Sequence, residues 1–193
     1  MSLDAKQVLK VLHSSLPDTL LENYGLATSQ TSNVSSVQEI LQQLINLKTD
    51  ELFCASISRA ARDISKSGVK VYTYHFDRGD QFQGPMNGVP HHAVDLEYMF
   101  GNFTKGFKDK KDVDLSKALM RFWIGFANGK EPWSEYPTGK ALHITAEGEC
   151  TVVPRDEIKS RRWAAYAEME NNWAQVRKTG NMLMNAKLEG PAV

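Results

Sequence analysis

The spacing of apolar residues predicts several helices in the first third of the chain. One apolar stripe covers residues 8–16 and stops at Pro17, which cannot continue a helix, and a second short helix is expected over residues 20–24. Apolar positions at residues 37–45 and at residues 53–64 each fall on one helical face. The first third therefore reads as two short helices followed by two longer ones.

The helix over residues 53–64 carries boundary signals on both sides. Thr49 can cap the first free N–H groups, and Asp50 and Glu51 suit the positive end of the helix dipole. Gly68 supplies the left-handed residue that commonly follows a helix. We therefore expect a separate helix that begins behind Thr49.

The pattern changes to alternation directly after this helix. Residues 69–76 are β-branched or aromatic in alternation and form the best strand of the sequence. Residues 77–91 contain three glycines and two prolines, so a long loop follows the strand. A loop at the carboxyl end of a strand is the usual setting for a functional residue in an α/β fold.

Helical and strand patterns alternate again in the last part of the chain. A broad apolar face predicts a helix over residues 115–128. Two short strands, residues 142–145 and 150–153, flank a turn at Gly148, and a final helix is expected from residue 155 to about residue 176.

Composition narrows the classes of function. The 193 residues suit one soluble domain, and the Lys+Arg and Asp+Glu counts are both 23, so no basic excess attracts nucleic acid. No apolar run reaches the roughly 18 to 20 residues of a membrane span, and the first ten residues lack the apolar stretch of a signal peptide.

The candidate chemistry lies in a histidine pair. His91 and His92 stand in the long loop, while His13, His75 and His143 lie far away in sequence, so a zinc site is disfavoured and no cofactor or metal is expected. The two cysteines, Cys54 and Cys150, are in neither metal nor redox spacing; they could form one disulfide, but two thiols are the favoured interpretation.

The loop around the histidines resembles a known segment. Residues 88–101 read Gly-Val-Pro-His-His-Ala-Val-Asp-Leu-Glu-Tyr-Met-Phe-Gly. This resembles the catalytic-histidine segment of type-B carboxylesterases, including cholinesterases and fungal esterases, with its Gly-x-x-His loop, an acidic residue three positions later and a Phe-Gly ending. Those positions are His92, Asp95 and Gly101 in this chain.

Four further segments match the same family in the same order, so that the resemblance covers about residues 16–170. They are Leu20-Leu-Glu-Asn-Tyr24, Thr49-Asp-Glu-Leu-Phe53, Val71-Tyr-Thr-Tyr-His-Phe76, and Phe122-Trp-Ile-Gly-Phe-Ala-Asn-Gly129 with the Pro132-Trp133 and Tyr136-Pro137 pairs after it. Each motif alone is weak, but five motifs in order are specific. The resemblance implies an α/β fold: the helix-rich C-terminal portion of an α/β-hydrolase, with residues 1–193 as a single segment.

The resemblance also implies a chemistry. In this family a serine on a Gly-x-Ser-x-Gly turn attacks an ester, and a histidine takes and returns its proton, which suits an imidazole with an ordinary pKa of about 6.5. His92 is implied as that general base, and Asp95 as a neighbouring carboxylate that holds the loop or tunes a buried network. Many members have glycine after the histidine, where this chain has Ala93, and a shift of one residue would select His91.

The rest of the machinery is missing from the sequence. It contains no Gly-x-Ser-x-Gly and no His-Gly-Gly oxyanion loop, and the family's triad acid comes from further upstream than this chain extends. Glu22, Asp50 and Asp77 are conceivable replacement acids, but no spacing supports any of them. We therefore expect a catalytically incomplete chain.

Two hypotheses follow for its role. The first is part of a serine carboxylic-ester hydrolase, which acts on a small-molecule ester when the N-terminal part completes it. The second is a non-catalytic interaction or remnant protein that uses an esterase-like fold. The predicted strand over residues 69–76 would expose two unpaired edges if it stood alone, which favours self-association. A Gly-x-Ser-x-Gly frame immediately upstream in the DNA would favour the first hypothesis.

Overall fold

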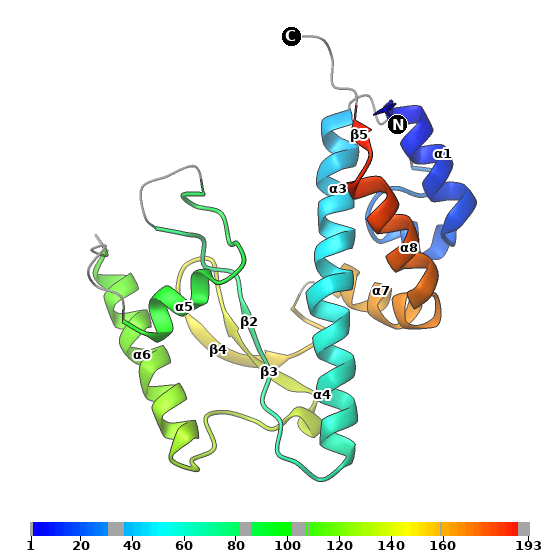
Figure 1. Cartoon of the computed structure of the whole chain (residues 1–193). Coiled ribbons are helices and arrows are strands. Elements are labelled where there is room, and N and C mark those ends of the chain that lie inside the picture. The colour runs from blue at the N-terminus through cyan, green and yellow to red at the C-terminus, as the bar shows by residue number, and fades with distance from the viewer. Residues whose placement is uncertain are drawn as a thin grey trace. The chain divides into compact units, whose positions relative to one another are not determined.

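The chain folds into two compact units. The first consists of Met1–Ala60 and Lys159–Val193, and the second of Ala61–Ile158. The structure, a computed structural model, describes residues 2–30, 37–81, 86–101, 107, 109–158 and 160–188. Each unit has its own hydrophobic core. Figure 1 labels the helices and strands of both units.

The first unit is helical. Its helices are α1 (Ala5–Ser15), α2 (Asp18–Glu22), α3 (Val37–Thr49), α7 (Ser160–Asn171) and α8 (Trp173–Met184), and the short strands β1 (Ser2–Leu3) and β5 (Lys187–Leu188) pair in parallel. Asp4 caps α1 by accepting from the Gln7 N–H at 2.8 Å. The predicted stop of α1 before Pro17 is confirmed, because Leu16 is already extended. Leu12, Leu20 and Leu21 lie at the centre of the core.

The predicted break before the fourth helix is wrong. Thr49 is helical, with φ −61° and ψ −45°, and its side chain caps nothing. The chain instead continues from α3 through a π-helical segment, Asp50–Ala55, into α4 (Ser56–Lys66). Gly68 does adopt the expected left-handed conformation, with φ 82°.

The π-helical segment turns two acidic residues inward. Asp50 and Glu51 are fully buried, so they do not serve as exposed charges at a helix start. The Tyr24 hydroxyl donates to Asp50 at 2.9 Å, while the Glu51 carboxylate pairs with Lys48 and, at 3.3 Å, with Arg177. Both buried carboxylates of the π-helical segment therefore have polar partners.

The predicted final helix is divided in two. It ends as α7 at Asn171 and restarts as α8 at Trp173, and the Asn172 side chain donates to the Glu168 carbonyl at 3.0 Å between them. α8 then runs to Met184, beyond the expected end at about residue 176.

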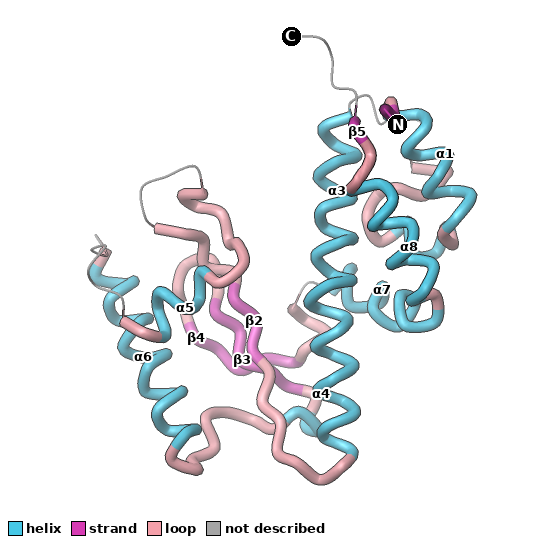
Figure 2. The backbone as a smooth tube through the Cα atoms, viewed as in Figure 1, coloured by secondary structure: helices cyan, strands magenta, loops and turns pink. Residues whose placement is uncertain are grey.

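The second unit contains a three-stranded sheet, shown in magenta in Figure 2. β2 (Tyr74–Phe76) pairs in parallel with β3 (Lys140–Ile144), which pairs antiparallel with β4 (Cys150–Pro154). β2 is shorter than the strand predicted over residues 69–76. One of its edges is covered by β3, so the expectation of two unpaired edges is wrong for that side; on the other side, no strand of the described residues pairs with it.

Two helices pack in the second unit beside this sheet. α5 (Val94–Met99) was not predicted, and α6 (Lys110–Ala127) begins five residues before the expected start; the two lie side by side (Figure 1). The early start places Asp112 inside the core, where Arg78 binds both of its oxygens at 2.9 and 3.1 Å and the Tyr98 hydroxyl donates at 3.0 Å. Leu115 and Leu119 complete this core on the α6 side.

Further expectations concern cysteines, membranes and apolar stripes. Cys54 and Cys150 form no disulfide, and burial raises the pKa of the Cys150 thiol.

Among the described helices none is long and apolar enough to cross a membrane. The predicted apolar stripe of Phe53, Ile57 and Ile64 is helical but 41%, 56% and 48% exposed.

Candidate active site

The histidine pair stands at the end of a loop that follows β2 and has a narrow neck. Asp80 donates its N–H to the Val89 carbonyl at 3.1 Å and accepts from the Gly88 N–H at 2.6 Å. Gly79 lies so close to Gly88 that an added Cβ would overlap the Gly88 carbonyl. Residues 82–85 of this loop lie outside the described part of the chain, while its neck and both histidines lie within it.

His92 occupies the corner of a tight turn. The Val94 N–H donates to the His91 carbonyl at 3.2 Å, and Ala93 between them has φ 68° and ψ 8°. These values match the third position of a type II turn, which favours glycine because the left-handed region strains any residue with a Cβ. The turn leaves the His92 side chain exposed.

Asp95 connects the first turn of α5 to β2. The Tyr74 hydroxyl donates to the Asp95 carboxylate at 2.6 Å. Burial and then this carboxylate raise the pKa of Tyr74 well above its usual value, so the phenol keeps its proton and remains a donor. The contact joins the helix after His92 to the strand before its loop.

His91 has two polar partners of its own. Its Nε2 lies 3.1 Å from the Asp80 carboxylate, and its Nδ1 lies 3.0 Å from the His92 carbonyl oxygen. These two contacts, the His92 carbonyl first, raise the pKa of His91. The sequence pattern did not reveal this pair, because Asp80 and His91 are eleven residues apart and meet only where the loop closes.

Two of the conceivable replacement acids, Asp77 and Asp50, have other partners. Asp77 accepts from His75 at 3.1 Å and from His143 at 3.0 Å, one histidine on each carboxylate oxygen. The strands bring this group together, because His75 and His143 face each other in the β2–β3 register. Asp50 binds Tyr24, as described above. No cluster of three metal-binding side chains occurs among the residues that the structure describes.

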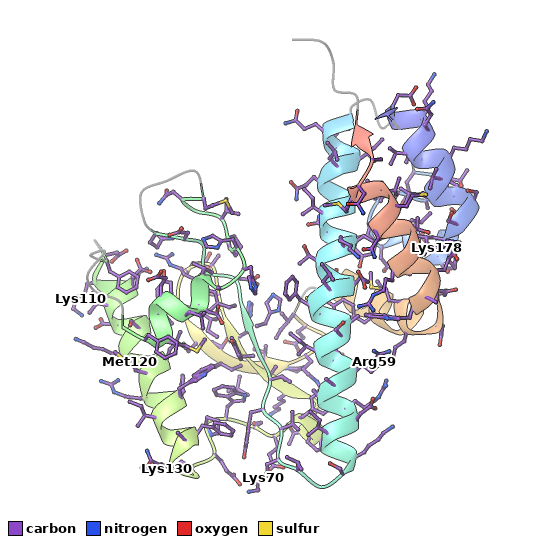
Figure 3. The ribbon with its side chains drawn as sticks, viewed as in Figure 1. Arg59, Lys70, Lys110, Met120, Lys130 and Lys178 are labelled. Carbon is purple, nitrogen blue, oxygen red and sulfur yellow. The ribbon has the colours of Figure 1, made fainter. Side chains whose placement is uncertain are left out.

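An aromatic pocket of about 200 Å³ opens beside Tyr74. Its lining consists of Tyr72, Tyr74, Phe122, Trp123, Phe126, Pro132 and Trp133. Trp133 also donates from its indole nitrogen to the Thr73 carbonyl at 3.0 Å. The pocket lies by the end of α6 that Lys130 marks in Figure 3, and Lys70 binds Glu131 and Glu135 at its margin.

The comparison with known proteins decides the family. A sequence model of the Carboxylesterase family matches residues 3–191. The chain belongs to the carboxylesterase family. It is 31% identical to Carboxylesterase 1E of Rattus norvegicus over an alignment 142 residues long, which covers 66% of the chain and 24% of that protein. It is also 29% identical to Carboxylesterase 4A of Bos taurus over an alignment 132 residues long, which covers 62% of the chain and 24% of that protein.

A cholinesterase is among the relatives of this carboxylesterase-family chain. Acetylcholinesterase of Bungarus fasciatus is 29% identical over an alignment 100 residues long, which covers 47% of the chain and 16% of that protein. The chain therefore spans about a quarter or less of the length of these relatives, as a partial α/β-hydrolase fold.

Proposed function

We propose that this chain supplies the histidine-bearing part of a serine carboxylic-ester hydrolase. His92 takes the proton of a serine as the serine oxygen attacks the ester carbonyl, and gives it to the leaving alcohol. His92 then takes a proton from water as the water oxygen attacks the acyl carbon, and it returns this proton to the serine oxygen as the serine ester bond breaks, which releases the acid. The observation that carries the proposal is the type II turn that exposes His92 directly after the neck of the loop.

The serine and the oxyanion donors of this proposal come from outside the sequence. The chain contains no Gly-x-Ser-x-Gly, and its carboxylate Asp77 is engaged by His75 and His143. A histidine without a nucleophile cannot form the serine ester on which this mechanism depends. The small-molecule ester substrate therefore belongs to the completed enzyme, and the isolated chain is inactive.

An esterase assay on the isolated chain tests this incompleteness. Hydrolysis of a p-nitrophenyl ester is measured for the unmodified chain and for His92→Ala, with His13→Ala as the control for an unrelated histidine. All three rates are expected to agree with one another. A rate that falls strongly in His92→Ala alone would show that the chain is catalytically complete and would contradict the proposal.

The outer edge of β2 supports a second, non-catalytic role: association with another chain. β2 pairs with β3 on one side, and no described strand pairs with it on the other. A free parallel edge offers unpaired N–H and carbonyl groups to a further strand, from a second copy or from an esterase-like partner. Sedimentation at increasing concentration tests self-association, which predicts a rising mass; a constant monomer mass argues against it.

A further inference from the structure

His91 is placed to control its neighbour. Its ring is only partly exposed, at 29%, and both of its nitrogens point at oxygen atoms: Nδ1 at the His92 carbonyl and Nε2 at the Asp80 carboxylate. A carbonyl and an ionised carboxylate can accept hydrogen bonds but cannot donate them. Both contacts are hydrogen bonds only when both nitrogens carry a proton, so the geometry fits the imidazolium form of His91.

We propose that His91 is a positioning residue for His92: as an imidazolium it donates to the Asp80 carboxylate and to the His92 carbonyl, and so holds the turn that presents His92. The inference rests on the proposed role of His92.

Asp80 is a fixed anchor for this contact. Its backbone is held on both sides by Val89 and Gly88, and its side chain is only 17% exposed. A carboxylate in such a partly desolvated position interacts with a cation more strongly than one in open water. The anchor thus connects the start of the loop to the turn at its end.

The other contact acts on the strained part of the turn. The His92 carbonyl belongs to the peptide group between His92 and Ala93, and Ala93 carries the left-handed backbone. Because Ala93 has a Cβ, the left-handed backbone is strained, and rotation of this peptide group would relieve the strain. A hydrogen-bond donor on the His92 carbonyl opposes that rotation. Loss of one proton from His91 removes one of its two hydrogen bonds, either that to the His92 carbonyl or that to the Asp80 carboxylate.

The pH dependence has a definite sign. The His92 carbonyl and Asp80 raise the pKa of His91 above its ordinary 6.5, while partial burial opposes them. The folded state therefore holds this proton more tightly than the unfolded state does. The contribution to stability is fully present below pH of about 6.5 and is lost as the pH rises through the folded-state pKa. The titratable groups that contact His91 are Asp80 across the neck and His92 in the turn. Asp95 instead binds the Tyr74 hydroxyl.

Nuclear magnetic resonance of the full chain tests the proposal without any catalytic readout. The ring signals of His91 are titrated in the unmodified chain and in Asp80→Asn, and the amide signal of Ala93 reports the adjacent His92 carbonyl. We expect a His91 midpoint above pH 6.5, an Ala93 amide that shifts with the same midpoint, and a lower midpoint in Asp80→Asn. A midpoint at or below 6.5, an Ala93 amide that does not follow it, or an unchanged midpoint in Asp80→Asn would each overturn the proposal.

A measurement on the unmodified chain covers the case in which Asp80→Asn does not fold. Ring nitrogen shifts at pH 6 distinguish an imidazolium from either neutral tautomer. Two protonated nitrogens on His91 are expected, and a neutral ring would contradict the assignment. Neither experiment measures ester hydrolysis, so a neutral His91 overturns this inference alone, whereas a His92-dependent esterase rate in the isolated chain contradicts the proposed function alone.

Discussion

The Tyr74 hydroxyl donates a 2.6 Å hydrogen bond to Asp95 and thereby joins the strand before the histidine loop to the helix after it. Tyr74→Phe removes this bond to a charged acceptor and is expected to lower the free energy of unfolding by about 1–2 kcal/mol. Urea unfolding measures the loss. Tyr72→Phe is the matched control, because no described residue bonds its hydroxyl and both rings line the same pocket. Equal losses in the two variants would mean that the hydrogen bond does not stabilise the chain.

Asp112 and Asp114, both on α6, allow a buried carboxylate to be compared with an exposed one. Asp112→Ala leaves Arg78 as an unpaired charge at the core and Tyr98 without its acceptor, so a loss of about 3–5 kcal/mol is expected. Asp114 pairs with Lys110, which marks the start of α6 in Figure 3 and is largely exposed. Asp114→Ala should cost less than about 1 kcal/mol. Thermal and urea unfolding compare the two variants, and similar losses would contradict the burial argument.

The left-handed backbone of Ala93 predicts a stabilising substitution at the turn. Ala93→Gly relieves a strain of about 1–2 kcal/mol but adds flexibility to the unfolded chain, so a net gain of about 0.5–1 kcal/mol is expected. Ala60→Gly, on the exposed side of α4, makes the same chemical change in a helix and should destabilise by about 1 kcal/mol. The sign of the two effects, measured by urea unfolding, must differ. A loss of stability in Ala93→Gly would refute the assigned turn.

The surroundings of Gly79, in the neck of the loop, and of Gly125, in α6, predict opposite effects of a glycine-to-alanine substitution on stability. An added Cβ at Gly79 would overlap the Gly88 carbonyl, so Gly79→Ala must force the neck apart and destabilise by more than about 1 kcal/mol. At Gly125, within α6, the nearest atom to such a Cβ is 3.9 Å away, so Gly125→Ala should stabilise by about 0.5–1 kcal/mol. Unfolding curves test both. A neutral Gly79→Ala would contradict the close approach.

The local sequence pattern predicted the helices that depend on residues close together in the sequence. It failed where the structure depends on contacts between distant residues. The apolar period located α1, α3 and α6, because each buries one face. Thr49 looked like a helix cap, yet the helix continues past it, and Tyr24 and Arg177 bind the acidic residues that follow. Such long-range partners leave no mark on a local pattern.

The same contrast holds at the candidate site. The motif around His92 and Asp95 is local and was visible in the sequence. The hydrogen bond from Tyr74 to Asp95 and the pairing of Asp80 with His91 depend on a strand and a loop neck that bring distant residues together. The shortening of β2 has a similar origin, because β3 offers partners to three of its residues.

A segment graft tests the central claim about His92 most directly. Residues 88–101 of this chain replace the corresponding histidine segment of an active relative such as Carboxylesterase 1E, with folding checked by circular dichroism. The graft should hydrolyse a p-nitrophenyl ester; His92→Ala should reduce kcat by at least about a thousandfold, and His91→Ala far less. A folded graft that is inactive, or one in which His91→Ala removes the activity while His92→Ala keeps it, would contradict the account.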